Sequence, residues 1–196
     1  MLENAIVRLE PLQAAHAPGL AAAASGSRDS YGWTAVPTPE TLEATIAQEL
    51  GRTAFWPIVQ IEAATDRVVG HTAYLTPRYW PDGRPLAVEI GSTWLHPDAQ
   101  GTAINTAAKL LLAQHAFEAL GVERLDIKTD ARNARARAGI LAIGWRFEGV
   151  LTSWQLSGAP GEQGLTRDTA MYAVTAAEWP EVRAHLTARL AAKSAR

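Results

Sequence analysis

Apolar positions along the chain follow two spacings, which divide it into strands and helices. Short runs of β-branched and aromatic residues, bounded by Gly, Pro or Asp, are typical of strands. Such runs predict strands at residues 6–11, 55–63, 67–75, 86–95, 124–129, 145–156 and 168–174. The short link at residues 64–66 predicts that the second and third strands form a hairpin.

Helical spacing occupies most of the remaining segments. It predicts helices at residues 13–24, 38–50, 104–120 and 133–143 and in the terminal segment. Thr38 followed by Pro39 has the form of an N-cap with proline in the first turn, and Leu42, Ile46 and Leu50 then share one face. The terminal helix presents an apolar stripe made of Trp179, Val182, Leu186 and Leu190.

Three segments rich in Gly, Ser and Pro are predicted to be irregular loops, at residues 25–38, 77–85 and 157–164. The second of them contains three prolines. The resulting order of elements is β-α-α-β-β-β-α-β-α-β-β-α, without an internal repeat or a linker. This order predicts a single domain over residues 1–196, built as a mixed α/β sheet with flanking helices.

Composition and charge narrow the function classes. The chain has 47% hydrophobic and 19% charged residues, a net charge of -2 and a pI near 6.2. A duplex nucleic-acid binder would carry a basic surplus, so no nucleic-acid partner is expected. The chain contains no Cys, and its five His residues have no metal-binding spacing, so no metal site is expected.

The start of the chain and its apolar runs bear on location. Residues 1–11 carry acidic side chains where a secretory signal would be basic and then apolar. No apolar run reaches the length needed to cross a bilayer. The sequence therefore predicts a cytoplasmic protein with no membrane partner.

Residues 94–106 combine features that suit the binding of a phosphate. A strand ends at Leu95, a short loop containing Gly101 follows, and a helix begins near Ile104. Such a turn points free backbone N–H groups and the positive end of a helix dipole at one spot. A glycine that merely makes a strand-to-helix turn would give the same pattern, so the segment alone leaves both interpretations open.

The same segment resembles the cofactor motif of the GNAT acetyltransferases, Q/R-x-x-G-x-G/A, with Gln100 in first place. The likeness is nearest to the ribosomal-protein-alanine (RimJ/RimL-type) branch. It extends in the family's order over nearly the whole chain, through residues 108–112, 115–118, 129–133, 144–151, 167–168 and 178–180.

The resemblance implies the GNAT fold, in which a mostly antiparallel sheet has two splayed strands and acetyl-CoA lies between them. Here these strands would be those at residues 86–95 and 124–129, and main-chain groups near Trp94 and Leu95 would hold the pantetheine arm. Asn133 matches a family Asn that bonds the cofactor near its thioester, and it also suits a helix N-cap. The pyrophosphate would lie against Gln100, Gly101, Thr102, Ala103, Ile104, Asn105 and Thr106.

Glu89 is the candidate general base, because family members often carry a Glu at this place on the strand that faces the cleft. An amine is largely protonated near neutral pH, so a base must remove a proton before the nitrogen attacks the thioester. A Glu on the solvated side of a strand, or one paired with an Arg, is the alternative interpretation.

The chain departs from the family pattern at two places. Ala103 replaces the second glycine of the motif, which costs little if its φ is negative and more if its φ is positive. Ala136 and Ile140 stand where family enzymes supply an acid for the leaving thiolate, and neither can donate a proton. We therefore expect the acid to be Tyr172 or water, or to be absent.

Two functions remain open on this basis. The first is an N-acetyltransferase acting on a small-molecule or peptide amine, and the second is a GNAT-fold protein that binds CoA or another ligand without catalysis. A Rossmann dinucleotide binder is disfavoured, because no GxGxxG follows the first strand. Similar proteins commonly pair through their final strands, so a homodimer is compatible with the resemblance.

Overall fold

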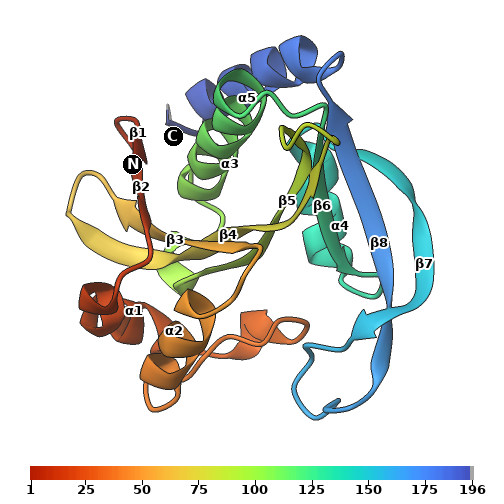
Figure 1. Cartoon of the computed structure of the whole chain (residues 1–196). Helices are drawn as coiled ribbons and strands as arrows, with labels where there is room; N and C mark the ends of the chain where they lie inside the picture. Colours follow the sequence, from red (N-terminus) through yellow and green to blue (C-terminus); the bar gives the residue numbers. More distant parts are fainter. Residues whose placement is uncertain (195–196) are drawn as a thin grey trace.

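One eight-stranded sheet organises the computed structural model, which describes residues 1–194 (Figure 1). The strands lie in the order β1-β2-β3-β4-β5-β6-β8-β7, and every neighbouring pair is antiparallel except β5 and β6. Their bounds are β1 Leu2–Glu3, β2 Val7–Pro11, β3 Phe55–Glu62, β4 Arg67–Tyr79, β5 Pro85–Leu95, β6 Arg124–Asp130, β7 Arg146–Leu156 and β8 Thr166–Thr175. The mixed α/β sheet predicted from the sequence is confirmed.

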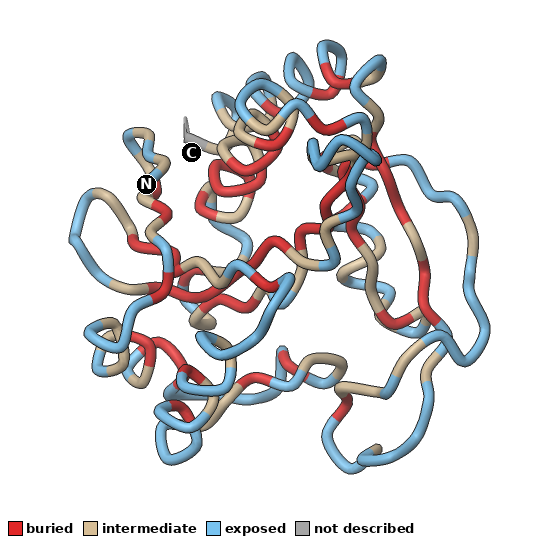
Figure 2. The backbone as a smooth tube through the Cα atoms, viewed as in Figure 1, coloured by how far each residue is buried: buried red, intermediate tan, exposed pale blue. Residues whose placement is uncertain are grey.

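Helices cover both faces of this sheet. They are α1 Ala17–Ala24, α2 Leu42–Leu50, α3 Ile104–Gln114, α4 Ala134–Ala142 and α5 Trp179–Ser194, and α3 continues into a π-helical turn, His115–Ala119. One hydrophobic core joins α3, α4 and α5 to the sheet, and a smaller one joins α1 and α2 to the opposite face. Figure 2 shows buried backbone along α3 and the central strands, whereas β7 is exposed along most of its length.

The parallel pair β5 and β6 is the irregular part of the sheet. Its register joins Ala87 to Arg124, Val88 to Leu125 and Glu89 to Asp126, and no later residue of β5 pairs with β6. Beyond that point β5 stays with β4 as far as Leu95, and β6 stays with β8 along its whole length. The two strands therefore splay apart after Glu89, as the resemblance implies.

The prediction of a loop over residues 77–85 is wrong. β4 continues to Tyr79 and β5 begins at Pro85, so the connection between them is short. Thr76 has a positive φ of 44°, and the register with β5 shifts beside it, so Pro77 lies in a bulge. Proline lacks the N–H that a regular ladder uses, and a bulge is one of the few places where a strand tolerates it.

The first two helices begin later than predicted. α1 starts at Ala17, and the residues before it, Ala14–His16, form a 3-10 turn that leads into it. α2 starts at Leu42, because Thr38 to Thr41 form a separate turn in which the Thr41 N–H donates to the Thr38 carbonyl at 3.1 Å. Leu50, expected on the buried face, ends α2 and is 49% exposed. The remaining predicted elements are present with small shifts at their ends, and β1 has no counterpart among the predicted strands.

No helix within residues 1–194 is long and apolar enough to span a membrane. Large apolar side chains nevertheless lie exposed on β7, which forms one edge of the sheet. They are Phe147, Val150, Leu151, Trp154 and Leu156.

Gly70 lies where β4 and β5 approach each other closely, beside the separation of β5 from β6. A Cβ at Gly70 would lie 2.2 Å from the Trp94 carbonyl oxygen and 2.9 Å from the Leu95 Cα, both backbone atoms. We expect Gly70→Ala to lower the free energy of unfolding by about 2 kcal/mol or more, measured by urea denaturation.

The matched control is Gly139→Ala in α4, where nothing lies within 4 Å of the added Cβ. It should leave stability unchanged or raise it by up to about 1 kcal/mol, since alanine favours helix over glycine. Equal stability of the two variants would mean that the β4–β5 approach is not a constraint.

Candidate active site

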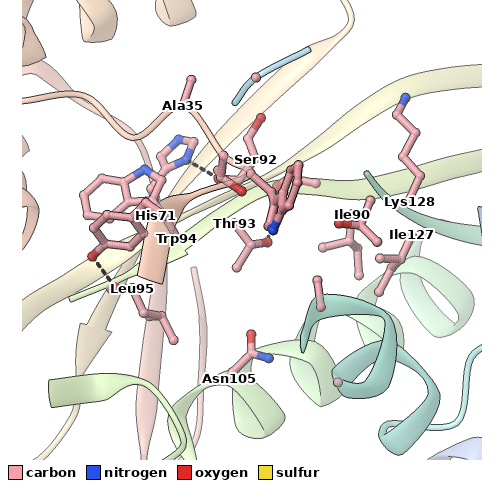
Figure 3. Close-up of a pocket in the computed structure, with 18 of the residues that line it drawn as sticks. Ala35, His71, Ile90, Ser92, Thr93, Trp94, Leu95, Asn105, Ile127 and Lys128 are labelled. Carbon is pink, nitrogen blue, oxygen red and sulfur yellow. Dashed lines mark hydrogen bonds between the residues drawn. The ribbon is translucent and has the colours of Figure 1, made fainter. Parts of the chain in front are cut away.

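A cavity of about 810 Å³ lies where β5 and β6 part. Its walls come from both splayed strands, the beginnings of α3 and α4, and side chains of α2, α5 and the 25–41 segment. In Figure 3, Thr93 and Trp94 stand on one side of the gap and Ile127 and Lys128 on the other. The cavity thus reaches both faces of the sheet through the opening between the strands.

The beginning of α3 supplies unpaired backbone donors to this cavity. Among the described residues, no acceptor is found for the N–H groups of Gly101, Thr102, Ala103, Asn105 and Thr106. Gly101 has a φ of 77°, a conformation that suits glycine. Free N–H groups at a helix start, together with the helix dipole, form a site for phosphate groups.

Ala103, which replaces the second glycine of the motif, causes no backbone strain. Ala103 caps α3 with a φ of -71°, in the right-handed helical region, where an added methyl group is tolerated. Ala103 and Ile104 do not line the cavity with their side chains, and Ile104 is buried in the core. Their contribution to the loop is therefore that of their backbone.

Cationic and unsatisfied polar groups surround the same loop. Arg135, Arg189 and Lys193 line the cavity, and Lys193 Nζ donates to the carbonyls of Gly101 and Thr102 at 2.9 and 2.8 Å. Two buried atoms, Asn105 Oδ1 and Arg189 Nε, have no partner among the described residues. In Figure 3, Asn105 stands on the first turn of α3 below Thr93. A ligand that donates a hydrogen bond to Asn105 Oδ1 and presents an anionic acceptor to Arg189 Nε would satisfy both atoms.

Gln100 and Asn133 hold the two helix starts beside the gap. Gln100 Nε2 donates to the Leu95 carbonyl at 2.9 Å, and its Oε1 accepts from Arg135 at 2.8 Å. Asn133 Oδ1 accepts from the Ala136 N–H at 3.0 Å, so Asn133 is an N-cap that also lines the cavity. Both interpretations of Asn133 from the sequence therefore remain compatible.

Trp94 and Leu95 lie at the end of the ladder between β4 and β5. Trp94 pairs with His71 and its ring stacks on the imidazole, with ring centroids 6.3 Å apart. The Leu95 carbonyl accepts from the Tyr31 hydroxyl at 2.7 Å. Both residues line the cavity, at its wall on β5.

Glu89 occupies the last paired position before β5 and β6 separate. Its side chain is only 4% exposed, and its Oε2 accepts from Lys128 Nζ at 2.8 Å and from Thr76 Oγ1 at 3.3 Å. Burial raises the pKa of the Glu89 carboxyl above its ordinary value, while the Lys128 ammonium opposes this shift. The nearby Asp126 carboxyl raises it further. Glu89 is thus a buried acid–base group that faces the cavity.

The structure does not bring Tyr172 to the cavity. Its side chain is fully buried in the core, and its hydroxyl accepts from Arg137 Nε at 3.1 Å. Tyr172 lies on β8, so β6 separates it from the gap. Ala136 and Ile140 do line the cavity, and neither carries a proton donor.

Sequence reasoning missed a polar pair on the α2 side of the sheet. His71 Nδ1 lies 3.0 Å from the Ser92 carbonyl, which can only accept, so Nδ1 carries a hydrogen. His71 Nε2 lies 3.1 Å from Glu49 Oε2. Both residues line the cavity. No signal in the sequence connects them, because 22 positions separate them and only β4 and α2 bring them together.

Sequence reasoning also missed Lys128 and Lys109, which both line the cavity. Lys128 had a usable signal, since Asp126, Lys128 and Asp130 alternate along β6 and must share one face of the strand. Lys109 is buried in α3 and contacts β5 from there. Within residues 1–194, no group of three or more His, Asp or Glu side chains is placed to hold a metal ion.

Comparison with known proteins places these features in context. A family model described as an acetyltransferase (GNAT) domain matches residues 7–146. A GCN5-related N-acetyltransferase from Brucella melitensis is 28% identical, with a TM-score of 0.83 over 96% of this chain and 84% of that chain. A T. thermophilus protein provisionally named an acetyltransferase is 33% identical, with a TM-score of 0.81 over 96% and 95% of the two chains.

A more distant structure shares the fold alone. Mycobacterium smegmatis RimJ, solved in complex with CoA-disulfide, is 20% identical, with a TM-score of 0.75 over 93% of this chain and 88% of that chain. Comparison with curated proteins gave no match.

The ion pair at Glu89 can be tested without any ligand. Lys128→Met removes the cation that favours the charged carboxylate, so the pKa of Glu89 should rise further. Carbon-13 NMR of the Glu carboxyl groups as a function of pH would follow this change. Arg84→Gln, which removes a cation from the exposed pair with Asp82, should leave the pKa of Glu89 unchanged. A fall in the Glu89 pKa in Lys128→Met would contradict the assignment.

Proposed function

The chain belongs to the GNAT acetyltransferase family, and from that membership we propose that it transfers the acetyl group of acetyl-CoA to a primary amine. The proposed acceptor is a small-molecule amine or a protein N-terminus, and the proposed route is direct attack of the amine nitrogen on the thioester. The observation that carries the proposal is the cavity between β5 and β6, with unpaired N–H groups at the start of α3 on one side and Glu89 on the other.

The cofactor half of the cavity fits CoA chemically. CoA carries phosphate groups, which suit the free N–H groups of residues 101–106 and the cations Arg135, Arg189 and Lys193. Asn105 Oδ1, buried and unpartnered, would accept a hydrogen bond from an amide of the pantetheine arm. The β5 backbone beyond Glu89 has no partner on the β6 side, so it offers N–H groups to that arm and to the thioester carbonyl.

We assign the proton transfer from the amine to Glu89. The incoming ammonium would lose a proton to this carboxylate, directly or through one water, and the freed nitrogen would attack the carbonyl carbon. An unpaired N–H group of β5 would stabilise the resulting oxyanion. Burial alone would leave the Glu89 carboxyl neutral over a wider pH range, and the contact with Lys128 offsets that effect. The ion pair thus supports a buried base that is charged when the amine arrives.

The acceptor would approach from the α2 side of the sheet. Glu89 follows Val88 and precedes Ile90, which both face the core beneath α3, so the Glu89 side chain points to the opposite face. That face carries the His71–Glu49 pair and, in the 25–41 segment, Trp33, which lines the cavity. These groups would contact the acceptor rather than CoA.

Cofactor binding is the first test. Isothermal titration with acetyl-CoA should give a Kd in the micromolar range or tighter. Arg135→Gln should weaken binding about fivefold at low salt, and less at high salt, because it removes one exposed cation facing the phosphates. Arg67→Gln, on the β3–β4 hairpin, is the matched control and should bind as wild type. Absence of binding at millimolar acetyl-CoA would remove the proposal altogether.

Catalysis is tested by thiol release with a panel of amines. Glu89→Gln keeps the size of the side chain and cannot accept the proton, so turnover should fall about 100-fold or more while the Kd for acetyl-CoA stays within about twofold. Glu62→Gln on β3 is the matched control with unchanged turnover. Acetyl-CoA binding without thiol release for any amine would instead favour a binding protein without catalysis.

A further inference from the structure

The wall formed by α4 cannot protonate a leaving group. Apart from Arg135, its residues that line the cavity are Ala136, Gly139 and Ile140. None of them carries an acidic hydrogen, although the thiolate of CoA, with a pKa of about 8.5, benefits from a proton as it departs. Any protein group that performs this step must come from another wall of the cavity.

The wall formed by α3 offers such a group in Lys109. Its side chain lines the cavity, is 5% exposed, and donates from Nζ to Thr93 Oγ1 at 2.8 Å. Thr93 lies on the part of β5 that has no partner on the β6 side. It is next to Ser92, whose φ of 49° marks a bulge. Lys109 forms no ion pair with any carboxylate of the described residues. A lysine ordinarily extends its ammonium to water, so a buried one without a counter-ion is costly and calls for an explanation.

The surroundings of Lys109 bring the pKa of its side-chain amine close to neutral pH. Burial lowers the pKa of Lys109 to about 7, and no neighbouring charge contributes to the shift. The elements that pack against α3 are β1, β2, α5 and its own π-helical continuation. Their ionisable side chains are Glu3, Arg8, Glu10, His115, Glu118, Glu181, Arg183, His185, Arg189 and Lys193, and Tyr74 of β4 also reaches α3, at the Leu112 carbonyl. Lys109 therefore exchanges its proton readily near neutral pH.

We infer that Lys109 donates the proton to the departing CoA thiolate, directly or through the Thr93 hydroxyl. As the C–S bond breaks, its electron pair goes to sulfur, and a proton from Nζ completes the thiol. Glu89 by then holds the first proton lost by the ammonium, and the nitrogen releases its second proton to solvent as the tetrahedral intermediate collapses. The amide product, the thiol, protonated Glu89, neutral Lys109 and that released proton together account for every hydrogen. Solvent then reprotonates Lys109 and deprotonates Glu89. This inference rests on the proposed function and deepens it.

The Thr93 hydroxyl is suited to relay the proton. Its Oγ1 accepts from Lys109 and also lies 2.8 Å from Thr72 Oγ1 and 3.4 Å from the Gly91 carbonyl. A hydroxyl donates one hydrogen and accepts two, so it can pass a proton toward the cavity while it receives one from Lys109.

The decisive measurement compares two ligands that differ only in the sulfur. The pKa of Lys109 is measured by NMR of the ¹³Cε-labelled lysines in the wild-type protein saturated with CoA or with desulfo-CoA. With CoA the pKa should be about one unit or more higher than with desulfo-CoA, because the thiolate form of the bound CoA sulfur would stabilise the ammonium beside it. Equal values in the two complexes would show that Nζ does not sense the sulfur and would overturn the inference. Failure of both ligands to bind would instead count against the proposed function.

Turnover of variants separates proton donation from mere charge or packing. Lys109→Met, which keeps a long apolar stem, should lower kcat about 100-fold with the KM for acetyl-CoA within about twofold. Lys109→Arg keeps the positive charge but does not release its proton, so it should not restore kcat. The loss of rate above pH 7 that is expected of the wild type should be absent from both variants. Restoration of kcat by Lys109→Arg would overturn proton donation.

Discussion

The parting of β5 from β6 is the constraint on which the rest of this structure depends. Parallel pairing lasts for three residues of each strand and stops at Glu89, while each strand keeps its antiparallel neighbour. Backbone groups that would pair in a continuous sheet are thereby left facing a cavity. Unpaired buried amides are costly, and they are tolerated where a ligand satisfies them. The separation of the two strands therefore both forms the cavity and leaves backbone groups that a ligand can satisfy.

Charge within this cavity is divided between two faces of the sheet. Toward α3, α4 and α5 lie Arg135, Arg189 and Lys193 with the free N–H groups of the 101–106 loop, which together suit an anion. Toward α2 lie two carboxylates, Glu49 and Glu89, each held by a single basic side chain, His71 and Lys128 respectively. A phosphate-bearing donor and a cationic acceptor would therefore enter from opposite faces and meet between the strands.

Local sequence patterns predicted most of the strands and helices. They failed at residues whose position depends on contacts with distant parts of the chain. The strands of the core and the helices after residue 100 follow their apolar periodicity closely, because burial on one face imposes it. Pro77 was predicted to be a loop residue, yet a bulge at Thr76 accommodates it inside β4. Tyr172 is the only phenol on the last strands, and the strand order puts β6 between it and the gap.

The sequence by itself determined the fold family, because the order of its motifs along the chain carries the resemblance. Through that resemblance it also predicted the phosphate-type loop at residues 100–106 and Glu89 as the candidate base. Only the tertiary structure decided what surrounds them. It joined His71 to Glu49, Lys128 to Glu89 and Lys109 to Thr93, each pair drawn from two different elements. Burial and pairing arise from contacts between distant segments, and local spacing carries no information about those contacts.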